Sequence, residues 1–204
     1  MPNMTTSQLL QHAKGNMFDQ YAERDIRYTD LMVASKCDRN SHLLACILSN
    51  WSVGHSALPA RLGLSLDNYR LLFRNFFPGI NWAEDVPNHG ELDLDRLVEK
   101  DDLVDLLMKH RRGQDIVEVW LAEIIAVSCI GQDHLWQDLG LWSRRELSEL
   151  LQYNFPTLAA KNDKDMKWKK FLYKQLCEEE GVYVCRAPSC DVCSDYDACF
   201  GSEE

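Results

Sequence analysis

The sequence predicts an all-α protein, with a bundle-like helical body followed by an irregular, cysteine-rich loop. Apolar residues recur at helical spacing through most of the chain, whereas alternating patterns rich in β-branched residues are scarce. Four cysteines crowd the last 20 residues, where Pro188 lacks a backbone donor. We therefore expect a helical domain over residues 1–180 and a separate tail over residues 181–204.

Seven segments carry the helical pattern, and they are 17–33, 41–51, 66–76, 92–110, 115–130, 144–153 and 163–179. Segment 115–130 is apolar almost all the way round, which predicts a helix at the centre of the core. Gly131 is placed to end it. Ser143 and Glu146 have capping-box spacing, so each side chain is expected to bond an exposed amide at a helix start. Asn162 is expected to cap the last helix.

The two halves of the body resemble each other, which predicts a duplicated helix–LGL–helix–FP unit over residues 45–80 and 122–158. Four matches at an offset of 77 or 78 residues carry this similarity: 45–48 (ACIL) with 122–125 (AEII), 62–64 with 139–141 (both LGL), Ser65 with Ser143, and 77–78 with 155–156 (both FP). Chance matching of common apolar residues is the alternative. Two copies are too few for a solenoid.

Charge and hydropathy exclude several classes of protein. The net charge is −10, and residues 178–204 hold eight acidic residues against the single basic residue Arg186. Nucleic-acid binders carry basic patches, so this tail argues against a nucleic-acid zinc finger. No secretory signal pattern and no uncharged apolar run of membrane-spanning length is recognisable. We expect a cytoplasmic, monomeric protein in which the clustered cysteines bind metal and do not form disulfides.

The tail cysteines have the spacing C-x4-C-x2-C-x5-C, formed by Cys185, Cys190, Cys193 and Cys199. Short loops between them allow four sulfurs to converge on one centre. The aspartates among them disfavour free thiolates, so the cysteines are better interpreted as metal ligands than as nucleophiles. Zinc sites usually separate two cysteine pairs by a longer loop, so the spacing favours an iron–sulfur cluster. Zinc and disulfides remain the alternatives.

Several segments resemble the NifQ family. They are 134–141 (HLWQDLGL), 155–156 (FP), 165–178 (DMKWKKFLYKQLCE) and 185–201, with LGLS and FPG at 62–65 and 77–79 also fitting. The resemblance implies an iron–sulfur protein that carries molybdenum in a Mo–Fe–S cluster. Its cargo would pass to the scaffold on which the nitrogenase iron–molybdenum cofactor is assembled, with the nitrogenase iron protein taking part. The four thiolates suit molybdenum and iron in sulfide clusters.

Other residues offer weaker candidates for metal chemistry. His134 could ligate iron or molybdenum, or simply bond within its helix turn beside Gln137 or Asp138. Cys177 could add a fifth thiolate, or be a small buried residue beside Tyr173. We expect Cys129 to lie in the core, and we assign Cys37 and Cys46 no role.

A lysine-rich helix precedes the tail, with Lys161, Lys164, Lys167, Lys169, Lys170 and Lys174. These lysines could attract molybdate or an acidic partner, but a lysine-rich helix face is more commonly just exposed to solvent. No P-loop, activated nucleophile or paired-carboxylate site is recognisable, so we do not expect an enzyme. A ferredoxin-like electron carrier and a zinc-stabilised interaction module are the alternatives to a molybdenum carrier.

Overall fold

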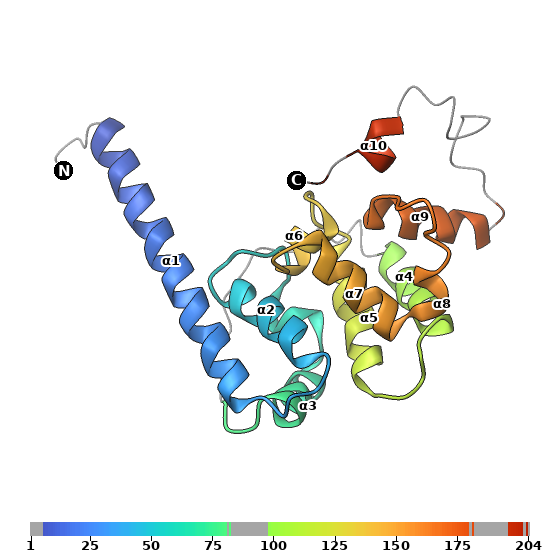
Figure 1. Cartoon of the computed structure of the whole chain (residues 1–204), viewed down its shortest axis with the longest axis horizontal. Helices are drawn as coiled ribbons and strands as arrows, with labels where there is room; N and C mark the ends of the chain where they lie inside the picture. Colours follow the sequence, from blue (N-terminus) through green and yellow to red (C-terminus); the bar gives the residue numbers. More distant parts are fainter. Residues whose placement is uncertain are drawn as a thin grey trace.

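The computed structural model describes residues 6–80, 82, 98–179, 181, 196–201 and 203, which form helices joined by turns, with no strand among them (Figure 1). The predicted all-α class is confirmed. In chain order the elements are α1 (Thr6–Ala34), α2 (Ser41–Ser52), the 3₁₀ turn η1 (Ala60–Gly63), α3 (Leu66–Phe76), α4 (Val98–Lys109), α5 (Val117–Ser128), α6 (Leu135–Leu139), α7 (Arg144–Asn154), α8 (Pro156–Ala159), α9 (Trp168–Glu179) and α10 (Tyr196–Phe200).

Helix α5 lies at the centre of the core, as its all-round apolar sequence predicted. It packs against α4, α6 and η1, and ten of its twelve residues are buried. Helix α1 packs against α2, while its first turns extend away from the body (Figure 1). None of the helices in the described part of the chain is long and apolar enough to cross a membrane.

One carboxylate is buried at the start of α5, where it serves the backbone. Glu118 is 0% exposed and accepts hydrogen bonds from the amides of Gly113 (2.5 Å), Gln114 (3.1 Å) and Asp115 (3.2 Å). The Nε of Arg112 lies 3.4 Å from its Oε1. The burial of this charge is tolerated because the three amides and the Arg112 guanidinium donate to the carboxylate.

The two LGL segments share the conformation of their glycine and a serine cap on the next helix, but they differ at the first leucine, since Leu62 has φ +59 in η1 whereas Leu139 lies in the α-helix α6. Gly63 and Gly140 both adopt φ +81, a left-handed conformation that favours glycine. Ser65 and Ser143 each cap the following helix by accepting a hydrogen bond from the amide three residues on. The capping box of Ser143 is confirmed, because the Glu146 carboxylate accepts from the Ser143 amide at 3.1 Å. A common origin for the two segments stays a prediction.

The structure corrects the predicted start of the lysine-rich helix. Asn162 does not cap it: its Oδ1 accepts from the Met166 amide and its Nδ2 donates to the Met166 carbonyl, both at 2.9 Å. These bonds close a loop in which Asp165 has φ +55, a value incompatible with a continuous helix. Helix α9 therefore begins at Trp168. The tail is also not wholly irregular, since residues 196–200 form the short helix α10.

Candidate metal centre

The last cysteine of the predicted ligand set is attached to the helical body. Cys199 lies in α10, half-buried, and packs with Phe200 against the core. The backbone amide of Lys167 donates to the Cys199 carbonyl at 2.8 Å. The Lys167 ammonium group donates to the Asp197 carbonyl at 3.0 Å. One residue just before α9 therefore holds α10 at two points.

The acidic residue that follows α10 is held by two groups of the body. Glu203 has a side chain only 4% exposed, with its Oε2 3.0 Å from the Nε of Arg144. Its other oxygen lies 3.7 Å from the Nδ1 of His134. Arg144 also bonds Asp165, through Nη2 and Oδ1 at 2.7 Å, and this bond together with the two carboxylate charges raises the pKa of Arg144. The tail is thus joined to the starts of α6 and α7.

His134 occupies the position immediately before α6. Its backbone amide donates to the Gln137 side chain at 3.2 Å, which bears out the alternative that His134 bonds within its helix turn, and its imidazole is 37% exposed. A surface hollow lies beside it, lined by Gln132, Asp133, His134, Gln137 and Glu203. The imidazole therefore faces solvent and a carboxylate at once, and can reach a ligand that enters this hollow.

Asp138 has a structural role in the same motif. It is 3% exposed, and its carboxylate is paired with the Lys169 ammonium group of α9. That ammonium also donates to the carbonyls of Gly131 (3.0 Å) and Asp133 (2.7 Å). A Cβ added at Gly131 would overlap the Asp138 carboxylate, so a larger residue there has to displace that carboxylate. The chain entering α6 is fixed to α9 by this arrangement.

The chain matches the family model NifQ over residues 43–201, a span that includes His134 and all four tail cysteines. It belongs to the NifQ family. Membership supports a role in nitrogen fixation, in biosynthesis of the nitrogenase iron–molybdenum cofactor.

Curated relatives resemble most of the chain. Protein NifQ of Azotobacter vinelandii is 44% identical over 186 residues, which cover 85% of this chain and 95% of the relative. A protein NifQ homolog of Sinorhizobium fredii is 39% identical over 82% of this chain and 74% of its own length. Protein NifQ of Rhodobacter capsulatus is 38% identical over 79% and 87%. No solved structure matches the chain.

The structure locates only some of the predicted ligands of this NifQ-family protein. Cys185, Cys190 and Cys193 lie outside the described residues. Cys177 is half-buried near the end of α9. The backbone carbonyl of Cys199, in contrast, accepts a hydrogen bond from the amide of Lys167, just before the start of that helix. The helical rise puts about 15 Å between these two levels. That Cys177 and Cys199 bind the same metal cluster stays a prediction, and this separation does not favour it.

Among the other thiols, Cys129 was expected in the core and is 3% exposed there, where burial raises its pKa to about 12. Cys37 is exposed. Cys46, to which the sequence assigned no role, lies beside His42 and Glu146, and the ligand atoms of all three fall within 4.8 Å of one another. The i, i+4 spacing of His42 and Cys46 was the signal available in the sequence.

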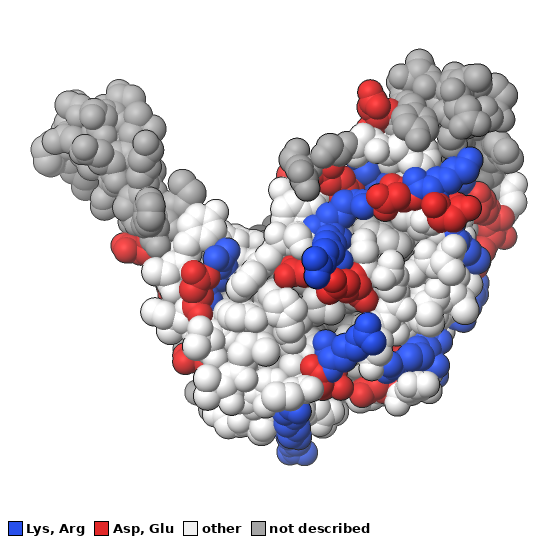
Figure 2. Space-filling model, viewed as in Figure 1, with Lys and Arg blue, Asp and Glu red and all other residues white. Residues whose placement is uncertain are grey.

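The lysines around α9 do not form a purely basic surface. Lys169 is paired with Asp138, and Lys174 lies 3.6 Å from Glu178. Figure 2 shows Lys and Arg groups interleaved with Asp and Glu groups over α7 and α9. This mixture favours the solvated-face alternative over a site for molybdate.

Proposed function

We propose that this protein carries molybdenum within a Mo–Fe–S cluster and supplies it for assembly of the nitrogenase iron–molybdenum cofactor. The observation that carries the proposal is the C-x4-C-x2-C-x5-C motif, which lies inside the NifQ match of residues 43–201. Cys185, Cys190, Cys193 and Cys199 would hold the cluster, which is cargo. Thiolates are the ligands preferred by soft metal–sulfide centres.

His134 is the body residue that we propose to handle molybdenum. It is solvent-accessible, lies beside a hollow, and approaches Glu203 in the segment that follows Cys199. An imidazole can complete the coordination of a metal that still lacks a ligand. The chain's own contribution is therefore to bind the cargo through sulfur and to offer nitrogen nearby.

Delivery requires a site that opens without unfolding the protein. Lys167 donates two hydrogen bonds to α10, whose Cys199 and Phe200 are partly buried against the core, whereas α5 is buried at the centre of the core. Local opening costs less where few buried contacts are lost. We therefore propose that α10 can detach while the body stays folded.

The acidic charge of residues 178–204 would complement a basic docking surface on the protein that receives the molybdenum. We propose the cofactor-assembly scaffold as that recipient, with the nitrogenase iron protein taking part, in the cytoplasm. Raising the ionic strength should slow delivery, because exposed charges are screened beyond about 10 Å at 0.1 M salt.

Transfer of metal is the test. Anaerobically purified protein containing iron and molybdenum is mixed with the cofactor-assembly scaffold, the two are separated, and molybdenum is measured in each. We expect molybdenum to move to the scaffold. Reversible one-electron redox with full retention of molybdenum would instead identify an electron carrier, and zinc as the sole metal would identify an interaction module.

A further inference from the structure

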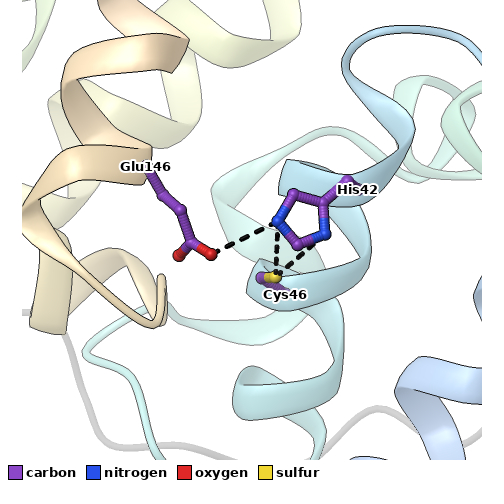
Figure 3. A group of neighbouring side chains, drawn as sticks. All are labelled: His42, Cys46 and Glu146. Carbon is purple, nitrogen blue, oxygen red and sulfur yellow. Dashed lines mark hydrogen bonds and ion pairs between the residues drawn. The ribbon is translucent and has the colours of Figure 1, made fainter.

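A second cluster of metal-ligating side chains lies far from the cysteine tail in sequence. His42 and Cys46 share one face of α2, and Glu146 reaches them from the first turn of α7 (Figure 3). The Nε2 of His42 lies 3.3 Å from the Glu146 Oε1 and 3.9 Å from the Cys46 Sγ. Nitrogen, sulfur and oxygen ligands therefore converge from two helices.

The nitrogen–oxygen separation is that of a tetrahedral metal site, and the sulfur lies somewhat farther away. Zinc–nitrogen and zinc–oxygen bonds of about 2.0 Å and a zinc–sulfur bond of about 2.3 Å place ligand atoms roughly 3.3–3.6 Å apart. The nitrogen–oxygen distance already has this value, and the nitrogen–sulfur distance needs to shorten by a few tenths of an ångström. Ligation needs the half-exposed His42 ring to turn, since the Cys46 Sγ lies as close to Nδ1 (3.8 Å) as to Nε2, and it needs the three ligand atoms, now within 4.8 Å of one another, to draw closer.

Each ligand is held in position by a further contact. The Oε2 of Glu146 accepts from the amides of Trp142 (2.7 Å) and Ser143 (3.1 Å), which leaves Oε1 directed at His42. The Tyr28 hydroxyl lies 2.8 Å from the Nδ1 of His42. An imidazole whose Nδ1–H donates to an oxygen presents Nε2 as its metal ligand, which is the usual arrangement in metal sites.

Access and charge also fit a metal ion. The Cys46 side chain is buried, Glu146 is 15% exposed, and the His42 side chain, 42% exposed, leaves a path from solvent. A thiolate and a carboxylate together neutralise a divalent cation, so the complex buries no net charge. The positive charge that acts on Cys46 is that of Arg24. Its guanidinium stacks on the Trp142 ring and is paired with Asp25 at 2.6 Å.

We infer that His42, Cys46 and Glu146 bind one divalent transition-metal ion of intermediate softness, such as Zn²⁺, with a fourth position open to water or a small ligand. The site joins α2 to α7 and is independent of the proposed molybdenum-carrier role. Mixed nitrogen, sulfur and oxygen ligands suit this class of ion better than Mg²⁺ or Ca²⁺, which prefer oxygen alone. Without the metal, the same residues would be a Tyr28–His42–Glu146 hydrogen-bond chain beside a buried thiol.

Cobalt titration distinguishes these two states. The parent is the full-length chain with Cys185, Cys190, Cys193 and Cys199 changed to serine, reduced and anaerobic, so that the tail cannot bind the probe. Co²⁺ should bind with one equivalent and give a thiolate-to-cobalt absorption band. Cys46→Ser should remove the band, whereas Cys37→Ser, at an exposed thiol, should leave it.

Two further variants separate ligation from folding. His42→Gln changes a half-exposed side chain and should weaken Co²⁺ binding by more than about tenfold while circular dichroism stays helical. Tyr28→Phe keeps all three ligands and should retain the band, with binding weaker by about tenfold. Zn²⁺ should displace Co²⁺ and raise the melting temperature of the parent but not of His42→Gln. Absence of the band, its survival in Cys46→Ser, or parent-like binding by His42→Gln would overturn the inference.

Discussion

The carboxylate of Glu203 lies 3.0 Å from the guanidinium of Arg144, with only 4% of the Glu203 side chain exposed. This pair joins the acidic segment after Cys199 to the first residue of α7, beside His134. The HLWQDLGL motif and Glu203, separated by α7, α8 and α9 in sequence, therefore lie close together. This contact, four residues beyond Cys199, supports the proposal that His134 acts together with the cysteine tail.

Glu203→Gln should release α10 without unfolding the body. The change removes the charge that Arg144 faces, while Arg144 keeps Asp165 as a partner. The free energy of local opening should fall by about 1–3 kcal/mol. Hydrogen exchange of the α10 amides, compared with those of α5, measures this loss.

The control is Glu149→Gln, which removes an exposed i, i+4 pair with the neighbouring Arg145. Such pairs contribute about 0.5 kcal/mol or less. If α10 exchanges at the same rate in wild type and Glu203→Gln, the pair does not hold the tail.

Gly131→Ala should destabilise the whole protein by about 2 kcal/mol or more, as an overpacked core does. The new Cβ would overlap the Asp138 carboxylate and push it away from Lys169. Chemical denaturation measures the change. Gly113→Ala is the control, since it has open space and carries only the cost of φ +77, about 1 kcal/mol.

A double-mutant cycle isolates the proposed clash. In an Asp138→Ala background the carboxylate is gone, so Gly131→Ala should cost little. Equal costs in both backgrounds would mean that Gly131 is required for another reason.

Local sequence patterns predicted the parts of the fold that depend on neighbouring residues. The central helix α5 and the capping box of Ser143 and Glu146 follow from periodicity and from a three-residue spacing. The failure at Asn162 has the same origin, because its side chain found Met166 within the loop instead of a helix start. Two bonding modes were open to it, and local sequence does not choose between them.

The parts that sequence could not predict depend on packing between distant segments. Cys46 has His42 as a neighbour through the i, i+4 spacing within α2, but it gains Glu146 only because the start of α7 approaches α2. Glu203 gains His134 in the same way. Apart from the i, i+4 spacing of His42 and Cys46, no motif marks either contact, because Glu146 and Glu203 each look like ordinary helix or tail residues in the sequence.

His134→Ala should lower molybdenum content while iron content stays near the wild-type value. Loss of a group that ligates or positions a metal commonly weakens binding by about ten- to a hundredfold. Metal analysis of anaerobic protein gives the ratio of molybdenum to iron. His110→Ala is the control, since His110 bonds Thr157 at 2.8 Å on another part of the body. An unchanged ratio would leave His134 with a structural role at the start of α6.

The central claim is that the cysteine tail holds molybdenum together with iron and sulfide. The most direct measurement is the iron, sulfide, molybdenum and zinc content of protein purified anaerobically from cells supplied with iron and molybdate. The account predicts iron, sulfide and molybdenum together, all lost when Cys185, Cys190, Cys193 and Cys199 are changed to serine, and all retained in Cys37→Ser. Zinc alone, or iron and sulfide that never bind molybdenum, would contradict it.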